Sequence, residues 1–140
     1  MDYSYLLTPL GAWLVAGSLK FLVNSARAGR LAFDLIGYGG LPSTHCAVVG
    51  STAALIALRE GIGHPAFGVA VTLLLIVVLD AGSLRRQVGD HASALNRMSH
   101  ADPQHKRLRE RMGHSPLEIV AGVVTGCLVA ALVDSGILSF

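Results

Sequence analysis

The sequence predicts an all-α fold, a small polytopic membrane helical bundle of about four transmembrane helices with an amphipathic interfacial helix between helices three and four. Its 140 residues are 52% hydrophobic and only 14% charged, whereas soluble domains carry about 25% charged residues. The apolar residues gather in four blocks, 6–23, 46–58, 61–79 and 119–133, the first with one charge and the others with none. We expect a single membrane-embedded domain over residues 1–140, and a soluble bundle with a buried core is the alternative.

The first predicted helix covers residues 6–23, a length that can cross a bilayer. Pro9 is tolerated because it falls in the first turns. Lys20 is costly inside an apolar block unless it reaches the interface or finds a partner. If the helix continues through Arg27, both cations lie on one face about 10 Å apart along the axis. The pair predicts either an interfacial anchor or an anion site.

The second helix is expected over about residues 43–58, after a connection that ends in Gly39 and Gly40. Pro42 presets the helix start, where its missing N–H group costs nothing. The N–H groups that follow then point out of a positive helix end, which favours an anion such as phosphate; they belong to Ser43, Thr44 and His45. A histidine there can pass a proton to the bound group, although a histidine that only caps the helix is the simpler interpretation.

The third helix is expected to begin after the turn at residues 61–65 and to end near Asp80. An aspartate at the C-terminal end of a helix opposes the helix dipole, so we expect Asp80 to pair with Lys20 or an arginine. An amphipathic helix should follow, because apolar side chains recur there at helical spacing. They are Leu84, Val88, Leu95 and Met98, and His91 falls on the same face. This pattern is typical of a helix that lies along a membrane surface or against the bundle.

The fourth helix starts after Ser115 and Pro116 and runs to about Val133. Ser115 and Glu118 form a capping box, which by itself explains the glutamate. It does not explain His114, placed just before the cap at a second helix start. A neutral imidazole can attack phosphorus, and a nearby carboxylate can fix its tautomer.

Positive charge is confined to two connections. Ten of the eleven Lys and Arg residues fall within residues 20–30 or 85–111, and with four spans these regions emerge on one side. The positive-inside rule then predicts that both are cytoplasmic and both termini external. We expect an integral protein of the bacterial inner membrane, with the membrane as partner and no nucleic acid. Gly122 and Gly126 form a small-residue face that packs within the bundle or forms a homodimer.

Three separated motifs resemble the type 2 phosphatidic acid phosphatase superfamily, which also includes vanadium-dependent haloperoxidases and bacterial acid phosphatases. Lys20 and Arg27 match the spacing of its first motif, with alanine instead of proline after the arginine. Residues 42–45 match its Pro-Ser-Gly-His motif, with threonine for glycine. His114 and Glu118 match the end of its third motif, with glutamate for aspartate, whereas Leu108 stands where that motif has an arginine.

The match is closer to the divergent membrane branch of this superfamily, and it covers nearly the whole chain. That branch carries Gly-Gly-Met-Pro-Ser-Ser-His, similar to residues 39–45 here. It also carries Asp-Ala-x-x-Val-Arg-Arg and Leu-Gly-His-Thr-Pro-x-Glu, similar to residues 80–86 and 112–118.

The resemblance implies hydrolysis of a lipid phosphate without a metal or other cofactor. It implies His114 as the nucleophile that forms a phosphohistidine, Glu118 as its orienting carboxylate and His45 as the acid that protonates the leaving oxygen. The phosphate would be held by Lys20, Arg27, Ser43 and Thr44. Arg85, Arg86, Arg107 or Arg109 would replace the arginine missing at Leu108. The lipid is left open among phosphatidate, phosphatidylglycerophosphate and polyprenyl phosphates or pyrophosphates.

Three other functions remain as alternatives. A non-catalytic lipid-headgroup-binding protein would keep the phosphate site without turnover, and the missing arginine favours it. A metal site would use His91, His100, His105 and His114, but their spacing is poor for metal ligation. A cysteine phosphatase centred on Cys46 lacks the arginine that should follow within a short loop, the next being Arg59.

Overall fold

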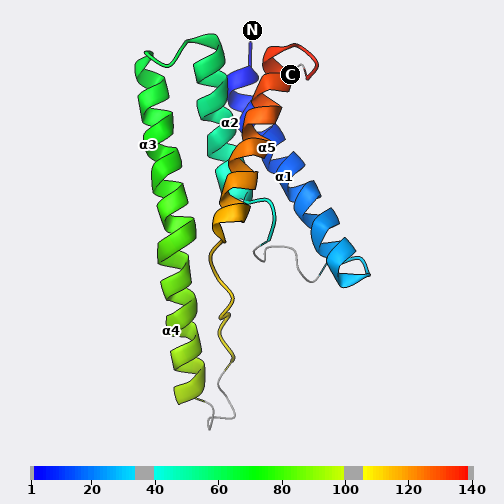
Figure 1. Cartoon of the computed structure of the whole chain (residues 1–140), viewed down its shortest axis with the longest axis vertical. Coiled ribbons are helices and arrows are strands. Elements are labelled where there is room, and N and C mark those ends of the chain that lie inside the picture. Colours follow the sequence, from blue (N-terminus) through cyan, green and yellow to red (C-terminus); the bar gives the residue numbers. More distant parts are fainter. Residues whose placement is uncertain (1, 34–39, 100–105, 139–140) are drawn as a thin grey trace.

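The computed structural model describes residues 2–33, 40–99 and 106–138 and forms a helical bundle (Figure 1). The bundle contains α1 (Ser4–Ala28), α2 (Thr44–Arg59), α3 (Pro65–Leu79) and α5 (Pro116–Asp134). Successive helices alternate in direction, so the start of α1, the end of α5 and the turn between α2 and α3 lie at one end (Figure 1). The all-helical membrane bundle predicted from the sequence is confirmed.

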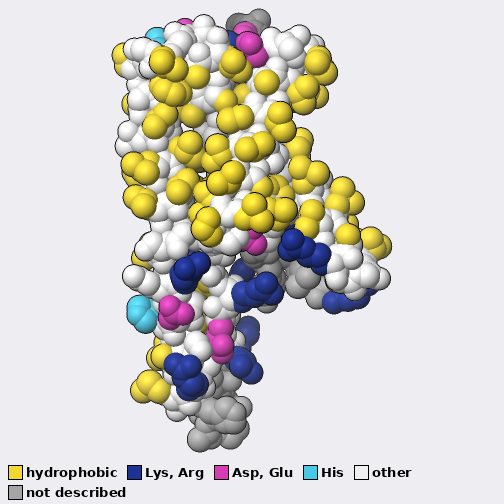
Figure 2. Space-filling view, in the orientation of Figure 1, with side chains coloured by type: hydrophobic (Ala, Val, Ile, Leu, Met, Phe, Trp, Pro, Cys, Tyr) yellow, Lys and Arg dark blue, Asp and Glu magenta, His cyan; other side chains and the backbone are white. Residues whose placement is uncertain are grey.

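Among the described residues, three helical segments are long and apolar enough to cross a membrane: α1, α5 and the continuous helix Pro65–Met98. The fourth bundle helix, α2, is apolar but has only 16 residues. Apolar side chains cover the bundle, and most of the Lys and Arg side chains visible in this view gather at the end opposite the N-terminus (Figure 2). The two basic regions predicted to share one side therefore do so in the fold.

The amphipathic helix is α4 (Arg85–Met98), and it continues α3 in line instead of lying as a separate helix (Figure 1). The two are joined by a π-helical turn, η2 (Asp80–Leu84). No proline interrupts residues 80–85, so nothing in the backbone stops the helix, and the wider turn accommodates one extra residue. As a result α4 projects beyond the bundle at its basic end.

The central helix, α2, packs most extensively against α5 and also contacts α1 and α3. The α2–α5 contact depends on two buried glycines: a Cβ atom at Gly122 would overlap the carbonyl oxygen of Ser43, and one at Gly126 would overlap that of Ala47. The Gly122/Gly126 face is therefore occupied within the chain. The suggestion that this face forms a homodimer is wrong, because α2 already covers it.

The helix starts agree with the sequence in two cases and differ in one. α5 begins with the predicted capping box, and α3 begins with Pro65 in its first turn. Pro42, however, lies before the start of α2 and not in its first turn. The N-cap is Ser43, whose Oγ accepts from the N–H group of Cys46 at 3.5 Å. A serine side chain can satisfy a helix N–H group that proline cannot, so the helix begins one residue after the serine.

At the end opposite the basic regions, Arg59 at the end of α2 contacts residues at the start of α1 and at the end of α5. Its guanidinium contacts the carboxylates of Asp2 at 2.8 Å and Asp134 at 3.2 Å, and it lies over the ring of Tyr5. This cluster joins the N-terminus to the C-terminal ends of α2 and α5.

We predict that Gly126→Ala destabilises the protein by about 1–3 kcal/mol, because the added methyl group overpacks the α2–α5 contact. The measurement is the temperature at which half of the purified protein leaves its folded, monodisperse state in detergent. Gly68→Ala in α3 is the matched control, since a Cβ atom there meets no described atom within 4 Å. If Gly126→Ala left the thermal stability unchanged but made the purified particle smaller than that of the wild-type protein, the glycine would lie at a dimer contact and not at the α2–α5 contact.

Candidate active site

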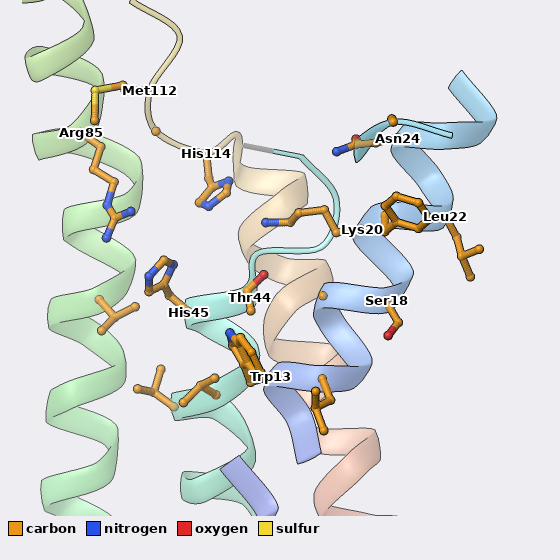
Figure 3. Close-up of a pocket in the computed structure, with 18 of the residues that line it drawn as sticks. Trp13, Ser18, Lys20, Leu22, Asn24, Thr44, His45, Arg85, Met112 and His114 are labelled. Atoms are coloured by element: carbon orange, nitrogen blue, oxygen red, sulfur yellow. The ribbon is translucent and has the colours of Figure 1, made fainter. Parts of the chain in front are cut away.

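A cavity of about 880 Å³ lies at the basic end of the bundle. Its walls come from α1, α2, the end of α3, the start of α4 and the segment that leads into α5 (Figure 3). One end is polar, and the side chains that bring a charge, a titratable group or a hydrogen bond there are Lys20, Asn24, Thr44, His45, Arg85, Arg109 and His114. Segments far apart in the sequence thus meet around one space.

His114 is paired with Glu118, one helical turn further along the chain. Its Nδ1 lies 3.2 Å from Oε2 of the glutamate, and the imidazole is almost fully buried. The same Oε2 atom accepts from the N–H group of Ser115 at 2.9 Å, so the capping box also fixes the carboxylate. A carboxylate at Nδ1 favours the tautomer that carries its proton there, which leaves Nε2 as the basic nitrogen.

The pKa of His114 is lowered, chiefly because burial disfavours the charged imidazolium. The hydrogen bond with Glu118 acts in the opposite direction, and the nearby positive charges of Lys20 and Arg85 add to the lowering. Burial therefore favours the neutral imidazole, the form in which a histidine can act as a nucleophile.

His45 lies in the first turn of α2 and lines the same cavity. Figure 3 shows its ring and that of His114 facing a common space, with the Arg85 guanidinium beside them and the Lys20 ammonium group across it. Thr44, next to His45, also lines the cavity. The two histidines, 69 positions apart in the sequence, are brought together at one end of the bundle.

Arg27 and Arg86, two of the arginines predicted to hold phosphate, lie outside this cavity. Arg27 falls in the last turn of α1, exposed and beyond Lys20. Arg86 lines a smaller pocket of about 240 Å³ on the other side of the His114–Glu118 pair, together with Arg111. Arg85 and Arg109 are the arginines that line the main cavity, and Arg85 is also paired with Asp80 at 2.6 Å.

Ser43 faces α5 and not the cavity. It is fully buried, and its backbone N–H group donates to the carbonyl oxygen of Glu118 at 2.8 Å. That N–H group cannot also hold a phosphate, so the predicted role of Ser43 as a ligand is replaced by a structural one. The remaining part of the predicted anion site is the first turn of α2, at Thr44 and His45. Gly39 lies outside the described residues, while Gly40 adopts a φ of 144° against the side chain of Asn24.

The segment that carries Arg109 and His114 is held along α4 by side-chain and backbone contacts. Asn96 bonds the backbone of Leu108 twice, accepting from its N–H group at 2.8 Å and donating to its carbonyl at 2.9 Å. It also donates to the Glu110 carboxylate at 2.8 Å. Near η2, the N–H group of His114 donates to the carbonyl oxygen of Ala81 at 2.9 Å. The position of His114 is thus set by the continuous helix.

Two glycines allow this close approach. A Cβ atom at Gly89 would overlap the carbonyl oxygen of Glu110, and one at Gly113 would come within 3.2 Å of the Ala81 carbonyl oxygen and the Arg86 nitrogen. Gly113 also has a φ of 86°, which other residues rarely adopt. Sequence reasoning did not identify Asn96 or Gly89 as supporting residues. The sequence offered one indication of their role: α4 carries a polar and a small residue, and the segment that packs on this helix follows it directly in the chain.

Within the described residues, no three His, Cys, Asp or Glu side chains gather so as to hold a metal ion. Of the four histidines considered as metal ligands, His100 and His105 lie outside those residues, and His91 is exposed on α4.

Taken together, the fold and the site define a small helical membrane protein with a paired-histidine, cation-lined cavity at one end of its bundle. The model of the Divergent PAP2 family matches residues 1–129, and the chain belongs to this family. It is similar to the "Uncharacterized membrane protein YuiD" of Bacillus subtilis (strain 168), with 28% identity over 141 residues that cover 89% of each chain. No solved structure matches the chain.

We predict that Asn96→Ala exposes the segment leading into α5 to protease. The side chain makes three hydrogen bonds to this segment, and loss of even one buried polar contact costs about 1–3 kcal/mol. Tryptic cleavage after Arg107, Arg109 and Arg111, measured by mass spectrometry, should accelerate at least several-fold because it depends on local opening.

The matched control is Gln87→Ala, an exposed position on the same helix. Equal cleavage rates in wild-type protein and both variants would show that α4 does not hold the segment.

Proposed function

We propose that the protein hydrolyses the phosphate ester of a membrane lipid through a phosphohistidine at His114, without a metal cofactor. The observation that carries this proposal is that His114, paired with Glu118 at 3.2 Å, lines the same cation-lined cavity as His45. A buried nucleophile with its orienting carboxylate and a second proton-transfer group form the arrangement that covalent catalysis requires. Membership of the Divergent PAP2 family supports it.

In the first step, Nε2 of His114 attacks phosphorus, and the bond between phosphorus and the lipid oxygen breaks. His45 donates a proton to that leaving oxygen. Glu118 stabilises the positive charge that develops on the His114 ring, through the hydrogen bond at Nδ1. In the second step, His45 takes a proton from a water molecule that attacks the phosphohistidine. Inorganic phosphate leaves, and His114 is regenerated.

The phosphoryl oxygens carry negative charge throughout, so the site needs preset cations. Lys20, Arg85 and Arg109 provide them from three different segments, and each strong donor contributes several kcal/mol of transition-state stabilisation. Arg85 and Arg109 would supply the charge that the superfamily motif places at the position of Leu108. Thr44 adds a hydroxyl and the N–H groups of a helix start.

The distribution of charge supports a cytoplasmic site in the inner membrane of a bacterium. Ten of the eleven Lys and Arg residues belong to the regions at the cavity end, and the positive-inside rule places such regions in the cytoplasm. A cytoplasmic site is suited to an intermediate of phospholipid synthesis, such as phosphatidate or phosphatidylglycerophosphate. Polyprenyl phosphates and pyrophosphates remain in the substrate panel.

The test is phosphate release from this panel by purified protein in lipid nanodiscs, with and without a chelator. We expect His114→Ala to lower kcat by at least about 10³-fold, because no other group replaces the nucleophile. His45→Ala should lower kcat about 10²-fold or more with a lipid substrate, but far less with p-nitrophenyl phosphate, whose leaving group needs no proton. His91→Ala, outside the cavity, is the matched control.

Turnover that survives His114→Ala would overturn the proposed nucleophile. No turnover by the wild-type protein, with saturable binding of lipid phosphate, would indicate the headgroup-binding alternative.

We predict that the acid limb of the kcat/KM profile lies below pH 6.5, the usual pKa of histidine, because burial lowers the pKa of His114. Activity is lost as the pH falls through that pKa, since protonation removes the nucleophilic lone pair. Glu118→Gln should move the limb to still lower pH, because the carboxylate raises this pKa, while kcat falls. A limb that moves to higher pH would contradict the pairing.

A further inference from the structure

The half of the cavity away from the cations is apolar and lies within the membrane-spanning part of the bundle. Its walls are Trp13, Leu14 and Gly17 from α1, Val48 and Val49 from α2, and Val77 from α3, and Ser18 is the polar residue between Gly17 and Lys20. α1 and α3 both pack on α2 but make no extensive contact with each other. α2 therefore forms the floor of a groove between them, and the groove is continuous with the polar end (Figure 3).

Along α1, the groove runs from a cation to an indole. Lys20 and Trp13 are seven residues apart, which places them on one face about 10 Å apart along the axis. Gly17 lies between them and also lines the cavity, and a Cβ atom there would meet no described atom within 4 Å. The absence of a side chain at residue 17 therefore leaves space in the groove and is not needed for helix packing.

We propose, on the basis of the function proposed above, that this groove binds one hydrocarbon chain of the lipid substrate. The headgroup lies against Lys20, the chain passes over Gly17 towards Trp13, and the lipid arrives from the bilayer between α1 and α3. A site with clustered cations at one end and apolar walls within the membrane matches an anionic amphiphile. Trp13 and Leu14 are also more than half exposed, so apolar side-chain surface is left open for a hydrocarbon chain to cover.

The first test compares an oleoyl lysophosphatidate with glycerol 3-phosphate, which has the same headgroup without a chain. The wild-type protein should prefer the oleoyl ester in kcat/KM. Gly17→Leu should lower this preference by about tenfold, because the added side chain fills the space that the chain needs. Gly68→Leu in α3 is the matched control, since its Cβ atom also meets open space but it does not line the cavity. An unchanged preference in Gly17→Leu would overturn the proposal.

The second test requires no turnover and uses Trp13, the only tryptophan of the chain. A lysophosphatidate with a brominated chain, present at low mole fraction in nanodiscs, should quench its fluorescence saturably. The same chain on lysophosphatidylcholine should quench only as bulk lipid does. Gly17→Leu should weaken the saturable quenching by about tenfold, and Gly68→Leu should not.

The two tests distinguish failure of the proposed chain site from failure of the proposed enzymatic function. Saturable quenching without hydrolysis would retain the chain site and remove the proposed enzymatic function. Hydrolysis with equal quenching by both lipids would retain the function and remove the chain site.

Discussion

The close parallel contact between α2 and α5 is the constraint on which the site depends. Gly122 and Gly126 let the helices approach until their backbones meet the carbonyls of α2, and the N–H group of Ser43 bonds the Glu118 carbonyl at their starts. The two helix starts are thereby held side by side. Since His45 is in the first turn of one helix and Glu118 in that of the other, this contact places His45 on the same cavity as His114, the partner of Glu118.

The long helix formed by α3, η2 and α4 supplies the second support. A π-helical turn often marks a functional site, and here the carbonyl of Ala81 within that turn accepts from the N–H group of His114. Beyond it, Asn96 holds the backbone of Leu108. The chain therefore returns along α4 before it enters α5, and this path brings Arg109 to the cavity. Extending a helix beyond the bundle gives a small protein enough structure to position a long connection.

The positions of the helices, and of His45 and His114 at helix starts, could be predicted from sequence because the patterns that indicate them are local. Apolar blocks indicate spans, and Ser115 with Glu118 indicates a helix start. The use of Ser43 as a cap, the closure of the Gly122/Gly126 face and the absence of Arg27 from the cavity could not. Each depends on which helices pack together and on how far along each helix the contact lies. The seven-residue spacing of Lys20 and Arg27 places both on one face of α1 but does not specify where along that face the cavity ends. Asn96 could not be found because two of its hydrogen bonds are to the backbone of Leu108, and backbone partners leave no pattern in the sequence.

The central claim is that one buried imidazole accepts the phosphoryl group while a second serves the leaving oxygen. Its most direct test is to mix the protein with a lipid phosphate, quench within milliseconds in alkali, and map phosphorylated residues by mass spectrometry. Phosphohistidine is stable to alkali and labile to acid, and we expect a single such adduct at His114, which disappears in His114→Ala. An adduct on another residue, or turnover with no phosphohistidine at any time, would contradict it.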